Sequence, residues 1–227
     1  MPSNYTDVIL VYDLPYFKER DQQTVLDFIR AHPFAMLIGS CQEQPIATQV
    51  PVLIHESDGS RLFLRGHMMR NTDHHKAFAQ NKEALCVFSG AHTYVSARWY
   101  SNPQTGSTWN YMSVHARGKI CFLGEPELLK ILEQLTAQFE NDEDSPALFR
   151  HLPKAYVNSL KSAIIAFEIE VRTLENVFKL SQNRDESSYE RIIRELNAQG
   201  GDGRIIADEM SKRKEQLFQK NRPERSK

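Results

Sequence analysis

The chain has 227 residues and a mass of 26.2 kDa, which is enough for one large β-rich domain or two small ones. Hydrophobic residues make up 41% and charged residues 25%, so the composition excludes a disordered chain and a mini-protein that depends on cross-links. With 28 basic and 29 acidic residues the formal charge is -1, so any contact with nucleic acid must come from a local patch.

The N-terminal sequence and the cysteines predict a cytoplasmic protein. The N-terminus lacks the basic start and apolar run of a signal peptide, and no apolar stretch approaches the roughly 20 residues that cross a bilayer. Cys41, Cys86 and Cys121 form no Cys-x-x-Cys pair, and the last two lie in apolar stretches where buried thiols are the ordinary interpretation. We therefore expect a cytoplasmic location and no membrane partner.

The first predicted elements are a helix and a strand meander. Asp21 can cap a helix that runs to about Ala31, in which the apolar residues have the spacing of one buried stripe. Residues 56–60 have turn chemistry. Three short apolar runs lie before and after this turn, at 34–39, 45–55 and 61–66. They predict an antiparallel meander.

A second helix and further strands follow. Asn71 is predicted to cap a helix through about Gln80, and a strand is expected at 84–88. Strict alternation then predicts a long strand from Trp109 to Leu123 with one buried face. Further segments are predicted as a helix at 126–139 and strands at 165–171 and 177–180.

These elements predict the fold class. Some seven strands and three helices that do not alternate regularly favour an α+β protein, an antiparallel barrel with peripheral helices. We expect a barrel domain over residues 1–186 and a helical C-terminal extension with a basic tail over 187–227. Residues 212–227 carry seven basic and two acidic side chains, which either contact phosphates or are simply solvated.

Residues 64–76 form the most unusual stretch of the sequence. The chain leaves a strand through Gly66 and enters a helix near Asn71, and Arg65, Arg70 and Lys76 supply positive charge. A helix N-terminus with nearby cations suits a phosphate dianion, and glycine permits close approach of the backbone. The segment matches no Walker or dinucleotide motif, so a turn with solvent-facing bases stays a second interpretation.

Other chemistries have weaker support. His67, His74 and His75 lie close in sequence but lack metal-ligand spacing, so we expect no metal site. No activated nucleophile is visible, and Glu168 and Glu170 are expected at the surface. Aromatic residues between 94 and 111 can either stack on a planar heterocycle or belong to a core or dimer interface. The loop at 178–184 is rich in hydrogen-bond donors.

Five blocks together carry a family resemblance. They are Arg30–Ala35, Leu64–Met68, Ser96 with Trp99 and Tyr100, Thr108–Tyr111 with Val114 and His115, and Phe178–Arg184. In this order they resemble the PaiB family, which is described as FMN-binding negative transcriptional regulators similar in fold to the pyridoxamine-phosphate-oxidase-like split barrels. The resemblance runs from about Tyr12 to about Leu196.

The resemblance implies a homodimeric split barrel with two FMN sites at the subunit interface. The FMN phosphate is then expected at Arg65, His67, Asn71 and Lys76. The flavin ring is expected near Thr48, Gln49, Tyr94 and Ser96. Residues expected to complete the pocket from the other subunit are Trp109, Asn110, Lys179, Ser181 and Gln182. Met68, Met69, His74 and His75 depart from the family's pattern around the phosphate.

The resemblance also implies a role in transcriptional repression, with DNA or a regulatory protein as the partner. The sequence of the predicted barrel contains no helix-turn-helix pattern, so the predicted helices around Gly200 are the only candidate for DNA contact. One alternative is a flavin reductase or oxidoreductase that uses reduced nicotinamide on the same scaffold. Another is a haem-binding or haem-degrading split barrel with His67, His92 or His115 as axial ligand.

Overall fold

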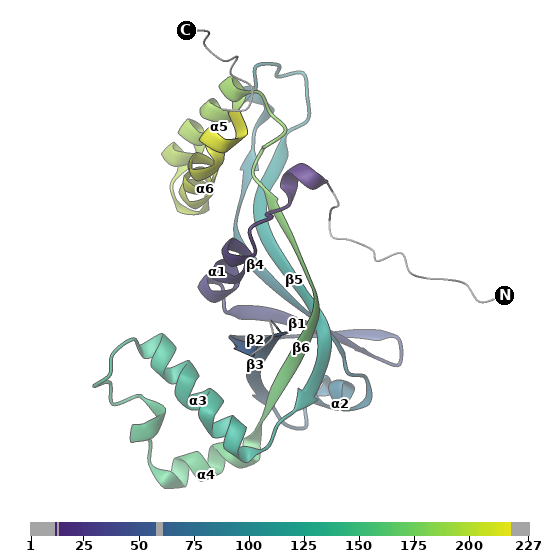
Figure 1. Cartoon of the computed structure of the whole chain (residues 1–227), viewed down its shortest axis with the longest axis vertical. Helices are drawn as coiled ribbons and strands as arrows, with labels where there is room; N and C mark the ends of the chain where they lie inside the picture. The colour runs from purple at the N-terminus through teal and green to yellow at the C-terminus, as the bar shows by residue number, and fades with distance from the viewer. Residues whose placement is uncertain (1–11, 13, 58–60, 219–227) are drawn as a thin grey trace, which may run out of the picture. The chain divides into compact units, whose positions relative to one another are not determined.

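The computed structural model describes residues 12, 14–57 and 61–218 (Figure 1). Its six strands form a closed barrel in the order β1-β2-β3-β6-β5-β4. The strands are β1 (Phe34–Cys41), β2 (Gln44–Ser57), β3 (Arg61–Met69), β4 (Glu83–Val95), β5 (Thr108–Phe122) and β6 (Ile164–Lys179). The barrel confirms the predicted antiparallel α+β fold, since the pairs β1–β2, β1–β4, β2–β3 and β3–β6 are all antiparallel.

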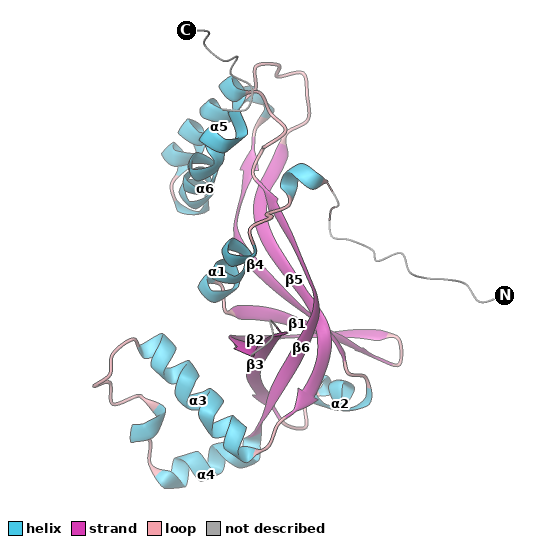
Figure 2. Ribbon diagram, viewed as in Figure 1, coloured by secondary structure: helices cyan, strands magenta, loops and turns pink. Residues whose placement is uncertain are grey.

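The described part of the chain also contains six α-helices (Figure 2). They are α1 (Gln22–Ala31), α2 (Asp73–Gln80), α3 (Glu125–Glu140), α4 (Lys154–Ala163), α5 (Glu186–Gln199) and α6 (Gly201–Phe218). Short 3-10 helices occur at Pro15–Phe17, Ala97–Trp99 and Phe149–His151. None of the helices within these described residues is both long and apolar enough to span a bilayer.

The chain forms two compact units. One unit contains residues 26–88 and 114–174, and the other contains 1–25, 89–113 and 175–227. In the first unit, β1 and β2 pair with Phe34 opposite Pro51, and β2 and β3 pair with Val52 opposite Gly66. The predicted meander at 34–66 is therefore confirmed, while part of its predicted turn, 58–60, lies outside the described residues.

The core of the first unit follows the strand alternation. Leu37, Leu64 and Ile169 are completely buried, and so are Val114 and Ala116 from the long strand predicted around residues 109–123. On the opposite side of the sheet, α3 packs its apolar stripe onto Ala166, with Leu128, Ile131, Leu132 and Leu135 in the same cluster. The predicted helix at 126–139 is therefore confirmed as an amphipathic helix on the barrel.

The second unit is built around the pair α5 and α6. Asp185 caps α5 by accepting from Ser188 N at 2.9 Å, and Tyr189 donates from its buried hydroxyl to Met210 O at 3.0 Å. Gly200 and Gly201 have positive φ values of 71° and 51°, which let the chain reverse between the helices. The predicted C-terminal helices are thus present, and residues 219–227 of the predicted basic tail lie outside the described residues.

The structure corrects several predicted elements. The strand predicted at 84–88 runs on to Val95, and α4 was not predicted. The strands predicted at 165–171 and 177–180 are one strand, β6, so there are six strands among the described residues instead of seven. Polar residues interrupt the alternation in β6, but Asn176 is held there because it exchanges hydrogen bonds with the Glu19 backbone, at 2.8 and 3.0 Å.

Two smaller predictions also change. Thr72, not Asn71, is the N-cap of α2, because its hydroxyl accepts from His75 N at 3.4 Å while Asn71 has a φ of 64°. Cys86 is buried as predicted, and burial raises the pKa of its thiol to about 12, but Cys121 is exposed. The capping of α1 by Asp21 is confirmed, since its carboxylate accepts from Thr24 N at 3.0 Å.

Candidate functional site

Arg65 and His67 lie on the outer face of the barrel in the first unit. In β3 the buried residues Leu64, Gly66 and Met68 alternate with Arg65 and His67, which therefore point to the other side of the sheet. Two of the four predicted phosphate ligands thus share one face.

Arg65 is already paired in the folded chain. Its Nε donates to Oε2 of Glu168 at 2.6 Å, across the register that places the two residues opposite each other on β3 and β6. Their side chains are 32% and 17% exposed, so Glu168 is not the free surface residue that strand parity predicted. Arg65 also lines a cavity of about 200 Å³ with Glu127 and Lys130 of α3. A second cation therefore lies beside the same cavity.

His67 sits further along the same face, opposite Ala166. Its Nδ1 is buried and has no hydrogen-bond partner among the described residues. Burial lowers the pKa of His67, so the imidazole is neutral near pH 7. A neutral imidazole with an unused nitrogen can donate one hydrogen bond to an oxyanion without adding charge.

Asn71 and Lys76 lie on the connection from β3 into α2. Asn71 N donates to His75 Nδ1 at 3.1 Å, and Thr72 caps the helix, so part of the helix N-terminus is satisfied by its own side chains. Arg70 donates from Nε to Ile164 O at 2.9 Å and fixes the end of β3. Lys76 is exposed one turn into the helix, where its ammonium group is accessible to a ligand.

Gly66 has a different role from the one its sequence context indicates. A Cβ at Gly66 would lie 2.7 Å from the Phe167 ring and 2.7 Å from Pro51 O. The missing side chain therefore allows barrel packing on the inner face. The Cβ position of Gly66 is thus on the face opposite Arg65 and His67, and the expectation that this glycine lets a phosphate approach the backbone stays a prediction.

Thr48 and Gln49 point to opposite sides of β2. Thr48 pairs with Leu37, which is completely buried, whereas Gln49 pairs with the partly exposed Met36 on the outer face. The exposed Phe34 pairs with Pro51 on that same outer face. Of the two predicted ring contacts on β2, only Gln49 therefore shares the face that carries Arg65 and His67.

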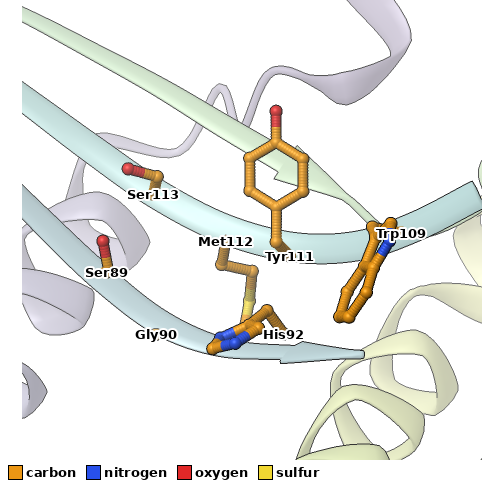
Figure 3. Close-up of a pocket in the computed structure, with 7 residues that line it drawn as sticks. All are labelled: Ser89, Gly90, His92, Trp109, Tyr111, Met112 and Ser113. Atoms are coloured by element: carbon orange, nitrogen blue, oxygen red, sulfur yellow. The ribbon is translucent and has the colours of Figure 1, made fainter. Parts of the chain in front are cut away.

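In the second unit, β4 and β5 carry an exposed aromatic face. A cavity of about 370 Å³ lies there, lined by Ser89, Gly90, His92, Trp109, Tyr111, Met112 and Ser113 (Figure 3). The Trp109 ring lies 6.1 Å from the His92 ring and 6.0 Å from the Tyr94 ring, and Trp109 and Tyr94 are 53% and 48% exposed. Exposed rings around a hollow of this size offer a surface for a planar heterocycle.

Ser96 and Asn110 support this face from within. Ser96 is nearly buried and its hydroxyl accepts from Arg98 N at 3.3 Å. Asn110 is completely buried, accepts from Ser181 Oγ at 3.0 Å and donates to Met210 Sδ at 3.5 Å. Asn110 and Ser181 were both predicted as ligands, but in the folded chain they bond to each other.

Lys179 and Gln182 lie at the end of β6. Lys179 Nζ donates to Thr108 Oγ1, next to Trp109. Gln182 accepts from Leu180 N at 2.7 Å and donates to Phe178 O at 2.5 Å, so its amide is used within the turn. Of these two predicted ligands, Lys179 alone presents a group at the edge of the aromatic face.

Two further residues beside Lys179 were not predicted as site residues. The Arg184 guanidinium lies over the Tyr100 ring, 4.0 Å from its centroid. Both residues belong to the sequence blocks at 96–100 and 178–184, but their contact joins segments more than eighty residues apart. The sequence alone gives no signal for such a contact.

The three histidines considered as haem ligands have different surroundings. His92 lines the aromatic cavity and its backbone N donates to Asp202 Oδ2 at 3.3 Å. His67 and His115 are part-buried on strands β3 and β5. Across residues 12, 14–57 and 61–218, no three His, Cys, Asp or Glu side chains gather as a metal site would require.

The chain is similar to several known proteins. Residues 11–173 match the family model described as "Putative FMN-binding domain". The chain is 31% identical over 186 residues to the "Protease synthase and sporulation protein PAI 2" of Bacillus subtilis (strain 168), covering 82% of this chain and 89% of that protein. It is also 32% identical over 193 residues to an uncharacterised protein of Emericella nidulans, covering 70% and 77% of the two chains.

Solved structures share the fold. The FAD and heme binding protein from Mycobacterium smegmatis aligns with a TM-score of 0.54 at 17% identity, covering 72% of this chain and 73% of that one. A putative 5-nitroimidazole antibiotic resistance protein from Bacteroides thetaiotaomicron VPI-5482 aligns with a TM-score of 0.50 at 15% identity, covering 70% and 84%. These likenesses support the split-barrel fold. The family match and the Bacillus relative show that the chain belongs to the PaiB family of FMN-binding-domain proteins.

Proposed function

We propose that the protein binds FMN between two copies of the chain and acts as a negative regulator of transcription. The observation that carries the cofactor is the outer barrel face, which holds Arg65 and the unpartnered Nδ1 of His67. The exposed Lys76 follows on α2, the next element along the chain. The family match, whose description is an FMN-binding domain, supports the same cofactor.

The residues present fit the two ends of FMN. Its phosphate carries nearly two negative charges, which suit the cations Arg65 and Lys76 and the uncharged donors His67 and Asn71. Its planar ring suits the exposed rings of the aromatic face. When bound, FMN supplies hydride or single-electron chemistry, and the chain's own contribution is to bind and orient the coenzyme.

In this proposal the aromatic face comes from the partner chain. Trp109 and Tyr94 are too exposed to be core residues of one protomer, and Phe34 and Met36 are exposed on the barrel. A symmetric dimer covers such surfaces and creates two equal sites. We assign Gln49 and Lys179 to the rim of the ring site. Thr48, Ser96, Asn110, Ser181 and Gln182 support the surrounding backbone instead.

The regulatory role is proposed from the Bacillus relative, whose name refers to protease synthesis and sporulation. The test deletes the gene in its own organism and restores either the wild-type chain or the double variant Arg65→Ala with Lys76→Ala. We expect deletion to raise a defined set of transcripts that the wild type, but not the variant, represses again. Unchanged transcript levels after deletion would refute the regulatory role.

The alternative function as an oxidoreductase is supported by the cavity of about 370 Å³ on the aromatic face. This cavity can admit a second planar group, such as a nicotinamide, next to the flavin. Anaerobic mixing of the flavin-loaded protein with NADH or NADPH tests it. Bleaching of the flavin absorbance supports an enzyme, and unchanged absorbance supports a structural or sensing role for the flavin.

A further inference from the structure

Two cationic side chains lie near each other at the end of β6. Lys179 is the last residue of the strand, and Arg184 follows in the loop before α5. Within residues 12, 14–57 and 61–218, neither of them forms an ion pair with a carboxylate. The neighbouring Asp185 is occupied, since it accepts hydrogen bonds from Ser188 and from Ser101 Oγ at 2.9 Å.

The two positive charges act on each other. Burial, and after it the charge of Arg184, lower the pKa of Lys179 below its usual range. Adjacent cations without a counter-charge are unfavourable in a folded chain, and a bound anion relieves their repulsion. The pair therefore has the electrostatics of an anion site.

Tyr100 adds a buried donor to this pair. Its side chain is 3% exposed, and the Arg184 guanidinium lies 4.0 Å from its ring centroid. Tyr100 Oη and Arg184 Nε are both buried and have no partner at good hydrogen-bond geometry within the described part of the chain, although Arg184 is close enough to Tyr100 to lower its pKa against the effect of burial. Buried donors are nearly always satisfied in native proteins, so two together indicate a missing acceptor. Burial raises the pKa of Tyr100, which keeps the phenol protonated as a donor.

Lys179 and Tyr100 lie close to exposed aromatic residues. Lys179 Nζ donates to Thr108 Oγ1, and the next residue is the exposed Trp109. Tyr94, half exposed and in edge contact with Trp109, is near enough to raise the pKa of Tyr100 further. A small molecule that reaches the aromatic face can therefore place an anionic group against the cations.

We propose that Lys179, Arg184 and Tyr100 form a binding site for the oxyanion of a small molecule, either a carboxylate or a phosphate monoester. The site goes beyond the proposed flavin site, because its three residues differ from those assigned to the FMN phosphate and lie in the other compact unit. Only Lys179 is shared with the rim proposed for the flavin ring. It does not require that flavin is bound. Two cations and a phenol supply charged and neutral donors to the same oxyanion, as such sites require.

The test uses the full chain saturated with FMN, so that the flavin phosphate site is filled. Isothermal titration calorimetry with inorganic phosphate and with acetate, in a low-chloride buffer, measures binding of each probe. We expect one anion per chain for at least one probe. Lys179→Gln, Arg184→Gln and the near-isosteric Tyr100→Phe should each weaken binding about tenfold, the effect of one lost charge-assisted hydrogen bond. Lys119→Gln, whose ammonium is 3.9 Å from Glu83, serves as the control and should bind as the wild type.

The outcomes separate this site from the flavin proposal. Loss of anion binding in the three variants, with FMN affinity retained in Arg184→Gln and Tyr100→Phe, supports the site. Wild-type affinity in all three variants, or no binding of either anion to the wild type, overturns it. Loss of FMN affinity in Lys179→Gln and Arg184→Gln, with no additional anion bound, also overturns it by assigning the cations to FMN. If the wild type binds no FMN, the same titration on Arg65→Ala tests the anion site alone.

Discussion

Arg65 donates from Nε to Oε2 of Glu168 at 2.6 Å, across the paired strands β3 and β6. The cation that we assign to the FMN phosphate is therefore held by a carboxylate in the folded chain. A carboxylate beside a phosphate site orients the arginine but also repels the incoming phosphate. The balance between these two effects can be measured.

We predict that Glu168→Gln tightens FMN binding. The glutamine keeps the shape and one hydrogen bond but removes the repulsion, which is worth about 1 kcal/mol or roughly fivefold in affinity at a partly exposed pair. Quenching of flavin fluorescence during titration measures the change. The control is Glu170→Gln, since Glu170 is on the same strand and only 4.0 Å from the exposed Arg61. Weaker FMN binding by Glu168→Gln than by this control would contradict the prediction.

The buried imidazole of His67 should make stability depend on pH. The pKa of His67 is lower in the folded chain than its usual value near 6.5. At pH values between these two pKa values, the unfolded chain therefore binds more protons than the folded chain. Stability is therefore lost as the pH falls below about 6.5, with a slope of at most roughly 1.4 kcal/mol per pH unit. Urea unfolding from pH 7.5 to 5 should show a flatter dependence for His67→Gln. The exposed His55→Gln should keep the wild-type slope, and equal slopes for both variants would refute the prediction.

The Ser181–Asn110 hydrogen bond should stabilise the turn after β6. Ser181→Ala leaves the completely buried Asn110 Oδ1 without its 3.0 Å donor, which should cost about 1–3 kcal/mol. Thermal and urea unfolding measure the loss. Ser187→Ala, at an exposed position of α5, should change stability by less than about 0.5 kcal/mol. A loss in Ser181→Ala no larger than in this control would show that the bond contributes nothing.

Mixed dimers test whether each FMN site uses two chains. Arg65→Ala and Trp109→Ala should each reduce FMN binding at least tenfold, because one removes a phosphate cation and the other a ring contact. If the two residues come from different chains, a dimer of one variant with the other contains one intact site. Co-expression with two affinity tags should then restore about one FMN per dimer. If each site is formed by a single chain, no mixed dimer would recover binding.

Much of the fold follows from the sequence because alternation and helical spacing are local properties. For this reason the sequence predicts that Val114 and Ala116 are buried on one face of β5, and that α3 has an apolar stripe. The length of β6 was not, since polar residues such as Asn176 are kept in the strand by a partner 157 residues away. No local pattern reports such a contact.

The candidate site was predictable only as a set of residue types. The sequence identifies Arg65, His67 and the aromatic residues, but strand register decides that Glu168 pairs with Arg65 and that Gly66 faces the barrel interior. Register depends on pairing between distant segments, which a single sequence does not reveal. For the same reason the burial of Asn110 could not be foreseen.

The most direct test of the central claim is the flavin content of the natively purified protein. Heat or acid denaturation followed by chromatography of the released cofactor should give about one FMN per chain, with the yellow colour lost from the protein. Arg65→Ala with Lys76→Ala should remain folded by circular dichroism but release less than about a tenth of that amount. A colourless wild-type protein that fails to bind added FMN, or a double variant that retains FMN fully, would contradict the account.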